Sequence, residues 1–228
     1  MGILMEHKSG FTFKRMKDQM IEALLDDGIK DFRVLDAMSK VERHKFVDEA
    51  LWSRAYENRS LSIGHRQTIS QPYIVARMTE LLIQRFAGRG LVMKNVLEIG
   101  SGCGYQSAVL AQLSENVLGL ERIKPLVRKS RINLLELRIS NVKIKHADGF
   151  QAANELEQCF DGILCASAPR DIPIELIPLL KKDANLVIPV GSSNQTLTVV
   201  TKKSKQNYIT EEYDKVSFVP MLGGKTNH

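Results

Sequence analysis

The sequence contains few cysteines and no long apolar run. Its three cysteines, Cys103, Cys159 and Cys165, form no C-x-x-C pair. An odd number of widely spaced cysteines argues against a disulfide framework and favours free thiols in a reducing compartment. No stretch of about 18 apolar residues exists, so no membrane span is expected. The first residues, Met1 to Lys8, also lack the apolar core of a secretory signal. We therefore expect a cytoplasmic protein.

Aromatic side chains are also scarce, at 6% of the residues with a single tryptophan. This matters because the formal net charge is +6, and a basic chain can indicate nucleic-acid binding. The basic residues gather along 122–138, on the helix predicted at 125–137, and in a turn at 202–205, and neither group alternates with the aromatic rings that stack on bases. The charge therefore favours a solvated surface over a nucleic-acid groove. We also expect no bound metal.

The order of the predicted elements indicates an α/β fold. A chain of 228 residues with 43% hydrophobic side chains is long enough to bury one good core. Helical spacing of apolar residues dominates 14–25 and 71–86, and the segment 57–70 between them reads as polar and irregular. Beyond residue 95, apolar strands alternate with helices, which is typical of a mostly parallel, doubly wound sheet with helices on both faces. Strands are predicted at 96–99, 117–120, 142–145, 163–166 and 186–190, and helices at 105–113, 125–137 and 173–180.

The last part of the chain changes character. Residues 196–201 and 208–213 alternate like antiparallel strands, and 216–221 reads as one more strand. We therefore predict a single domain, 1–228, in three parts. Residues 1–90 form a helical cap and a substrate-side loop, 91–191 form a cofactor-binding core, and 192–228 form a C-terminal β extension.

A glycine-rich loop directly after a predicted strand is the most informative motif. Residues Val96 to Gly104 read Val-Leu-Glu-Ile-Gly-Ser-Gly-Cys-Gly, so the backbone is bare at the mouth of a helix, as a nucleotide-type cofactor requires. A dinucleotide fingerprint needs its third glycine three positions after the second, where this chain has Tyr105. Glu121 follows the next predicted strand, where a carboxylate accepts hydrogen bonds from ribose hydroxyls. The spacing favours adenosine without a pyrophosphate, and it resembles the pattern of class I S-adenosylmethionine methyltransferases.

Glu98, just before these glycines, has two interpretations. It belongs to the methyltransferase-like pattern, and an acidic residue near a helix N-terminus also interacts favourably with the helix dipole without touching a ligand.

A second unusual stretch runs from Gln67 to Tyr73 and reads Gln-Thr-Ile-Ser-Gln-Pro-Tyr. It offers hydroxyl and amide groups without a general base. Ser70 has two interpretations, which do not exclude each other. It caps the helix that has Pro72 in its first turn, or its hydroxyl contacts a substrate.

Over nearly its whole length the chain resembles the protein-L-isoaspartate O-methyltransferases. The resemblance rests on the Gln67 to Tyr73 run and on the segments Val96 to Leu113, Phe160 to Pro169, Leu186 to Gly191 and Val216 to Met221. It implies a Rossmann-like methyltransferase fold and transfer of a methyl group from S-adenosylmethionine to the free carboxylate of an L-isoaspartyl residue in a damaged protein or peptide. The ester then closes to a succinimide, and hydrolysis restores some normal aspartate.

The resemblance also implies roles for particular residues. Ser70 is associated with the reacting carboxylate, and Asp148 and Gly149 match positions near the adenine. Substrate contacts are expected from Gln67, Thr68, Ile69, Val219 and Pro220. Cofactor contacts are expected from Glu98, Gly100, Ser101, Gly102, Gly104, Glu121, Asp148 and Gly149.

The chemistry of carboxyl methylation agrees with the lack of a catalytic base. A peptide carboxylate with a pKa of about 4 is ionised at neutral pH, so no base is needed to make it a nucleophile. This fits a chain without an evident His-Asp or Cys-His pair.

One residue departs from the family pattern. The family usually has glycine where this chain has Arg66, and an arginine at a position of positive φ costs about 1 to 2 kcal/mol. We hypothesise that Arg66 attracts the substrate carboxylate or acidic residues beside it. The alternative is an exposed side chain on a loop.

Two other functions remain open. One is a class I methyltransferase that acts on another acceptor, such as a small molecule, a modified peptide or RNA. The other is a non-catalytic adaptor that binds S-adenosylmethionine. No apolar stripe is left over for an interface, so we expect a monomer.

Overall fold

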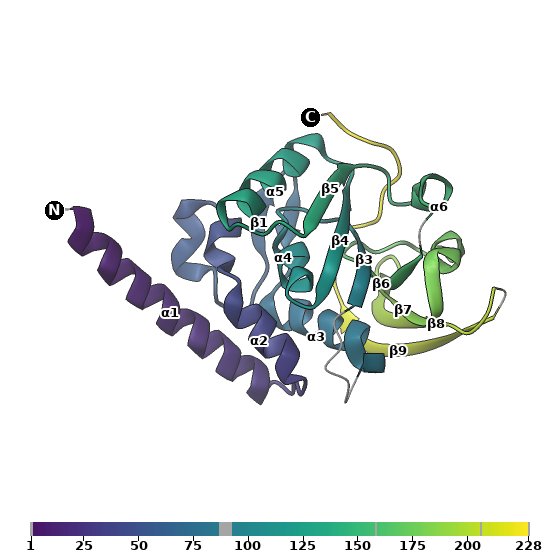
Figure 1. Cartoon of the computed structure of the whole chain (residues 1–228), viewed down its shortest axis with the longest axis horizontal. Helices are drawn as coiled ribbons and strands as arrows, with labels where there is room; N and C mark the ends of the chain where they lie inside the picture. Colours follow the sequence, from purple (N-terminus) through teal and green to yellow (C-terminus); the bar gives the residue numbers. More distant parts are fainter. Residues whose placement is uncertain (1, 87–92, 158, 206, 228) are drawn as a thin grey trace.

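The computed structural model describes residues 2–86, 93–157, 159–205 and 207–227 (Figure 1). In these residues the centre of the molecule is a seven-stranded sheet in the order β5-β4-β3-β6-β7-β8-β9. The adjacent strands from β5 to β7 pair in parallel. β8 pairs antiparallel with β7, and β9 pairs antiparallel with β8. The strands are β3 Met93–Ile99, β4 Ser114–Glu121, β5 Val142–His146, β6 Phe160–Cys165, β7 Leu180–Val190, β8 Gln195–Lys202 and β9 Tyr208–Val216. The predicted mostly parallel sheet with antiparallel C-terminal strands is confirmed.

Helices form the remaining layers, and the long α1 runs along the outside of the N-terminal part, purple in Figure 1. The α-helices are α1 Gly2–Asp26, α2 Phe32–Lys40, α3 Pro72–Ile83, α4 Tyr105–Ala111, α5 Lys124–Glu136 and α6 Ala152–Glu155. The short 3-10 helices are η1 Arg43–Phe46, η2 Glu49–Arg54, η3 Gln84–Phe86 and η4 Ile174–Leu179. Among the described segments, none of the helices combines the length and the apolar character of a membrane span.

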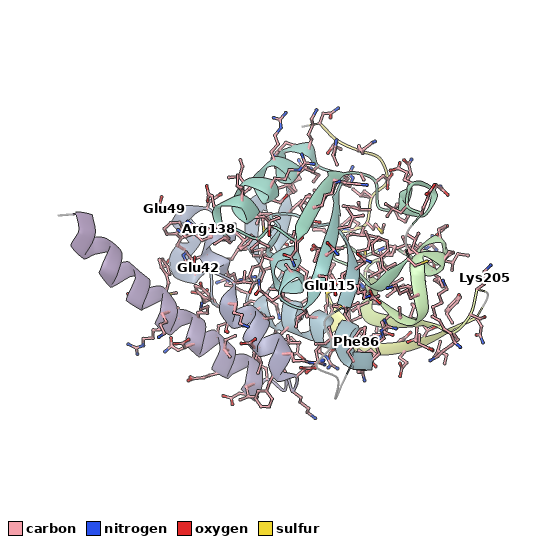
Figure 2. All side chains as sticks on the ribbon, in the orientation of Figure 1. Glu42, Glu49, Phe86, Glu115, Arg138 and Lys205 are labelled. Carbon is pink, nitrogen blue, oxygen red and sulfur yellow. The ribbon has the colours of Figure 1, made fainter. Side chains whose placement is uncertain are left out.

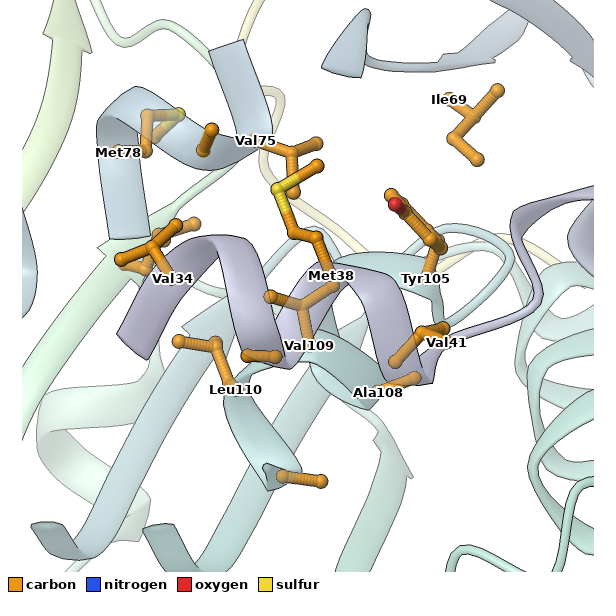
Figure 3. Packing of buried hydrophobic residues seen from close by; sticks show 14 of the residues in the cluster. Val34, Met38, Val41, Ile69, Val75, Met78, Tyr105, Ala108, Val109 and Leu110 are labelled. Atoms are coloured by element: carbon orange, nitrogen blue, oxygen red, sulfur yellow. The ribbon is translucent and has the colours of Figure 1, made fainter. Parts of the chain in front are cut away.

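The N-terminal helix α2 packs against both α3 and α4, which lie on the sheet. Asp31 caps α2 by accepting a hydrogen bond from the Arg33 N–H. Val34 and Met38 of α2 are fully buried, and Figure 3 shows them among side chains of α3 and α4. Burial of each such side chain contributes about 1.5 to 3 kcal/mol. The cap is therefore held rigidly beside the helix that follows the glycine loop.

Strand alternation divides the core into two clusters, one on each face of the sheet. Val96 belongs to the cluster shared with α1 to α5, whereas its neighbour Leu97 belongs to the cluster beneath η4. Met221, from the C-terminal segment, completes this second cluster. The C-terminal segment therefore belongs to the folded body of the protein.

Three sequence predictions are wrong. The segment 57–70 is not irregular throughout, because β1 Leu61–Gly64 and β2 Gln67–Ile69 form a hairpin. The helix expected at 173–180 is the 3-10 helix η4, with Pro178 inside it and β7 starting at Leu180. The strand expected at 216–221 is absent from the described chain. There the Phe218 N–H donates to the Gln195 side chain, and only Pro220 makes an isolated bridge, to Ala168.

Candidate active site

A cavity of about 550 Å³ lies where the order of the parallel strands reverses. β3 lies between β4, which follows it in the sequence, and β6, which comes later and pairs with its other edge. Crevices at such switch points, beyond the carboxyl ends of the strands, are the usual ligand sites of open α/β sheets. The volume falls within the range of small-molecule sites.

The glycine loop forms one wall of this cavity. Gly100 has φ +84° and Gly102 has φ +52°, and both line the cavity. These left-handed conformations suit glycine, and they leave the main chain uncovered. Gly104, with φ +91°, does not line the cavity. A Cβ there would lie 3.2 Å from Cβ of Ser130, so Gly104 permits α4 and α5 to pack closely.

Glu98 is a fully buried carboxyl group at the floor of the cavity. One of its oxygens accepts a hydrogen bond from the Ser107 hydroxyl. The other oxygen, Oε1, and the buried Ser101 hydroxyl have no partner in normal hydrogen-bond geometry among the described residues, although the hydroxyl lies close enough to Glu98 to lower its pKa. Burial raises the pKa of Glu98 to about 7. Because buried polar atoms rarely lack partners, this pair fits a ligand that carries donors and positive charge.

Glu121 joins the glycine loop to the end of β4. Its carboxylate accepts the Gly102 N–H at 2.9 Å and the Ile123 N–H at 2.8 Å. Burial raises the pKa of this carboxyl group. Glu121 still lines the cavity, and each carboxylate oxygen keeps a lone pair for a further donor.

The β1–β2 hairpin forms a second wall of the cavity. The residues that the sequence analysis predicts to contact the substrate here all line the cavity: Gln67, Thr68, Ile69 and Ser70. The Ser70 hydroxyl makes no hydrogen bond within the described chain, and Gln71 occupies the N-cap position of α3 without a side-chain bond. The Tyr73 N–H instead donates to Oδ1 of Asn58. The capping interpretation of Ser70 is therefore wrong, and its hydroxyl is free to contact a ligand.

His65 and Arg66 make the two-residue turn of this hairpin, with φ +52° and +56°. Such turns favour Asn-Gly, because both central residues need positive φ. The positive φ considered for position 66 is thus present. Arg66 is exposed, lines the cavity and forms no ion pair with the described residues.

The C-terminal segment closes the third side. Val219 and Pro220 line the cavity, and the segment is held by the Ala168 N–H, which donates to the Val219 carbonyl at 2.9 Å. The Met221 N–H returns a bond to the Ala168 carbonyl at 2.8 Å. The loop after β6 therefore positions the two predicted substrate residues.

Asp148 and Gly149 take different places. Gly149 lines the cavity, but Asp148 does not. The Asp148 carboxylate is buried and accepts the Phe150 N–H at 2.8 Å and the Gly224 N–H at 2.6 Å. It thus fastens the C-terminal segment beside the cavity, and a contact of its side chain with the cofactor stays a prediction.

Two buried residues behind the hairpin were not predicted from the sequence. Tyr105 lines the cavity from the first turn of α4. Arg43 lies behind it and donates to the Ser70 carbonyl. The sequence offers no signal for Arg43, which stands in the charged run Glu42-Arg43-His44-Lys45 and reads as a surface residue.

Comparison with known proteins gives one consistent family. The family model described as Protein-L-isoaspartate(D-aspartate) O-methyltransferase (PCMT) matches residues 14–226. A protein-L-isoaspartate O-methyltransferase of Methylobacillus flagellatus is 50% identical over 218 residues, which cover 94% of this chain and 95% of that protein. Its counterpart in Saccharophagus degradans is 48% identical over 218 residues, covering 95% and 96%.

A solved structure shows the same likeness. The crystal structure of a putative enzyme of this name from Plasmodium falciparum, in complex with S-adenosyl-L-homocysteine, is 29% identical with a TM-score of 0.76. The match covers 90% of this chain and 97% of that one.

Proposed function

The chain belongs to the protein-L-isoaspartate(D-aspartate) O-methyltransferase family, and from this premise we propose how its cavity serves that activity. The enzyme transfers a methyl group from S-adenosylmethionine to the free carboxylate of L-isoaspartyl residues in proteins and peptides. The roles of individual residues are our proposal.

The glycine-loop wall is the cofactor side. S-adenosylmethionine supplies an electrophilic methyl group on a positively charged sulfur. Glu98 and Ser101 offer the unpartnered oxygens that a cationic ligand with N–H donors requires, and Glu121 offers lone pairs for ribose hydroxyls. The bare main chain of Gly100 and Gly102 permits close approach, and Gly149 lines the same cavity.

The hairpin and the C-terminal segment form the acceptor side. The carboxylate needs no base, so the protein has to align it and exclude water. The Ser70 hydroxyl is a free donor at the cavity wall, and Thr68 provides a second hydroxyl on the same strand end. We assign Ser70 to the reacting carboxylate, with Gln67, Ile69, Val219 and Pro220 holding the chain around it.

The observation that carries this assignment is the free Ser70 hydroxyl, which lines the same cavity as the unpartnered Glu98 and Ser101 oxygens. We expect Ser70→Ala to reduce methyl transfer to an isoaspartyl peptide by a factor of about 10 or more, which corresponds to the loss of one hydrogen bond to a charged group. Calorimetric titration should give an unchanged affinity for S-adenosylhomocysteine. Full turnover in this variant would refute the role of Ser70, and loss of cofactor affinity would move Ser70 to the cofactor side.

We further propose that the protein acts as a cytoplasmic monomer, in one domain, without a nucleic-acid partner. The cap and the sheet share one hydrophobic cluster, which supports a single domain. Cys103 and Cys165 are buried and unpaired, and Cys159 is exposed and unpaired. Free thiols suit a reducing compartment. Size-exclusion chromatography with light scattering tests the monomer.

A further inference from the structure

Arg43 is a buried cation directly behind the acceptor wall. Its side chain is 0% exposed. Nε donates to the Ala55 carbonyl and Nη2 donates to the Ser70 carbonyl, each at 2.7 Å. The guanidinium carbon lies 4.7 Å from the centre of the Tyr105 ring. Ser70 and Tyr105 both line the cavity, so Arg43 contacts two cavity residues from the protein interior.

This cation has no counter-ion in the part of the chain that the structure describes. Its third nitrogen, Nη1, contacts no carbonyl or carboxylate there, and the Tyr105 phenol is the side-chain hydrogen-bonding group beside this guanidinium. Tyr105 acts on Arg43 through a side-chain hydrogen bond and electrostatically, and the thiol of Cys103 and the phenol of Tyr56 act electrostatically. None of these groups is a carboxylate. Burial lowers the pKa of Arg43, yet a guanidinium stays charged at neutral pH.

Such an arrangement is unusual, because arginine is almost never fully buried unless it is paired. The penalty for an unpaired buried ion is several kcal/mol after relaxation. Two carbonyls and the ring and hydroxyl of Tyr105 are neutral groups, so they compensate only part of this penalty. The low dielectric that makes the charge costly also carries its field into the adjacent cavity.

We propose that Arg43 is a positioning residue whose buried charge selects an anionic acceptor, so that the carboxylate of the isoaspartyl substrate supplies the counter-ion that the free protein lacks. This rests on the proposed function of the cavity. It adds a physical basis for acceptor choice, because a carboxylate is favoured over a neutral group of the same shape. Methylation removes the negative charge, so the same field favours release of the ester.

The proposal predicts a division between binding and catalysis. Attraction to the ionised carboxylate is strongest before the charges of the two reactants cancel, so it stabilises the bound substrate more than the transition state. Loss of the charge should therefore raise KM and leave kcat within about threefold, which is the pattern of lost ground-state binding.

The experiment compares two peptides, one with the isoaspartyl carboxylate and one with a carboxamide in its place. The carboxamide peptide is measured as a competitive inhibitor. For the wild-type protein we expect the carboxylate peptide to bind at least about tenfold more tightly, as a desolvated charge interaction requires. Equal binding of the two peptides by the wild-type protein would overturn the proposal without any variant.

Three variants assign the preference to Arg43. Arg43→Gln should bring the ratio of the affinities for the carboxylate and carboxamide peptides close to one. Arg43→Lys keeps the positive charge but cannot bind both carbonyls as the guanidinium does. It should retain the preference for the carboxylate peptide even if its melting temperature falls. Arg131→Gln is the structural control, because Arg131 also donates to a backbone carbonyl, that of Ile144, but does not line the cavity. A folded Arg43→Gln protein with the wild-type ratio would refute the role of Arg43. Absence of methyl transfer by the wild-type protein would instead refute the proposed function.

Discussion

Replacement of Glu98 by glutamine should change how the stability of the cofactor-free protein depends on pH. Burial raises the pKa of Glu98 to about 7 from an ordinary value of 4.5, and the nearby charge of Glu121 adds to this, whereas the Ser107 and Ser101 hydroxyls oppose it. Glutamine has nearly the same shape, and its side-chain oxygen can still accept from Ser107.

The magnitude follows from the two pKa values. Between pH 4.5 and about 7 the native protein holds a proton on Glu98 that the unfolded chain has released. The stabilisation is therefore complete below about pH 4.5 and is lost as the pH rises through about 7. A difference of about 2.5 units corresponds to about 3 kcal/mol. The glutamine of the Glu98→Gln variant cannot ionise, so the variant does not lose this stabilisation as the pH rises. The free energy of unfolding of the variant minus that of the wild type should therefore increase by about 3 kcal/mol between about pH 4.5 and a pH above about 7.

Urea unfolding at about pH 4.5 and about pH 8.5, followed by the fluorescence of Trp52, the single tryptophan, measures this difference. Glu115→Gln is the matched control, because Glu115 is exposed near the start of β4 (Figure 2). The control should differ from the wild type by the same amount at both pH values. If Glu98→Gln also differs from the wild type by the same amount at both pH values, the carboxyl group of Glu98 is not desolvated as described.

Three further predictions concern the walls of the cavity. Arg66 and Arg138 both have positive φ, so Arg66→Gly and Arg138→Gly should each raise the free energy of unfolding by about 1 kcal/mol. Only Arg66→Gly should raise the KM for isoaspartyl peptides with acidic neighbours, and equal KM values in the two variants would exclude a substrate contact by Arg66. Asn58→Ala removes the cap of α3 and should lower the free energy of unfolding by about 1 kcal/mol, whereas Ser70→Ala should leave it unchanged; the opposite result would return the capping role to Ser70. Asp148→Ala releases the Gly224 N–H and should speed both proteolysis within 217–227 and dissociation of S-adenosylhomocysteine, and unaltered proteolysis would show that other contacts hold this segment.

The parallel core and the glycine loop were predictable because their signals are local. Apolar strands of the core are continuous in the sequence, and Gly100 and Gly102 have the left-handed conformations that bare backbone at a strand end implies. The resemblance placed the acceptor segment at Gln67 to Ser70, and these residues line the cavity.

Other features depend on contacts that are distant in the sequence. The β1–β2 hairpin was missed because its strands have only four and three residues and its turn, His65-Arg66, lacks the usual turn formers. The cap of α3 comes from Asn58, fifteen positions before the N–H that it accepts. The apolar segment 216–221 is held by Gln195 and Ala168 instead of a neighbouring strand, and consecutive residues of it, Val219 to Met221, line the cavity.

The most direct test of the account is methyl incorporation from labelled S-adenosylmethionine into two peptides of identical composition, one with an L-isoaspartyl linkage and one with the normal aspartyl linkage. The account predicts base-labile label in the isoaspartyl peptide and none above background in its isomer. Equal labelling of both peptides, or no labelling by protein that binds S-adenosylhomocysteine, would contradict it.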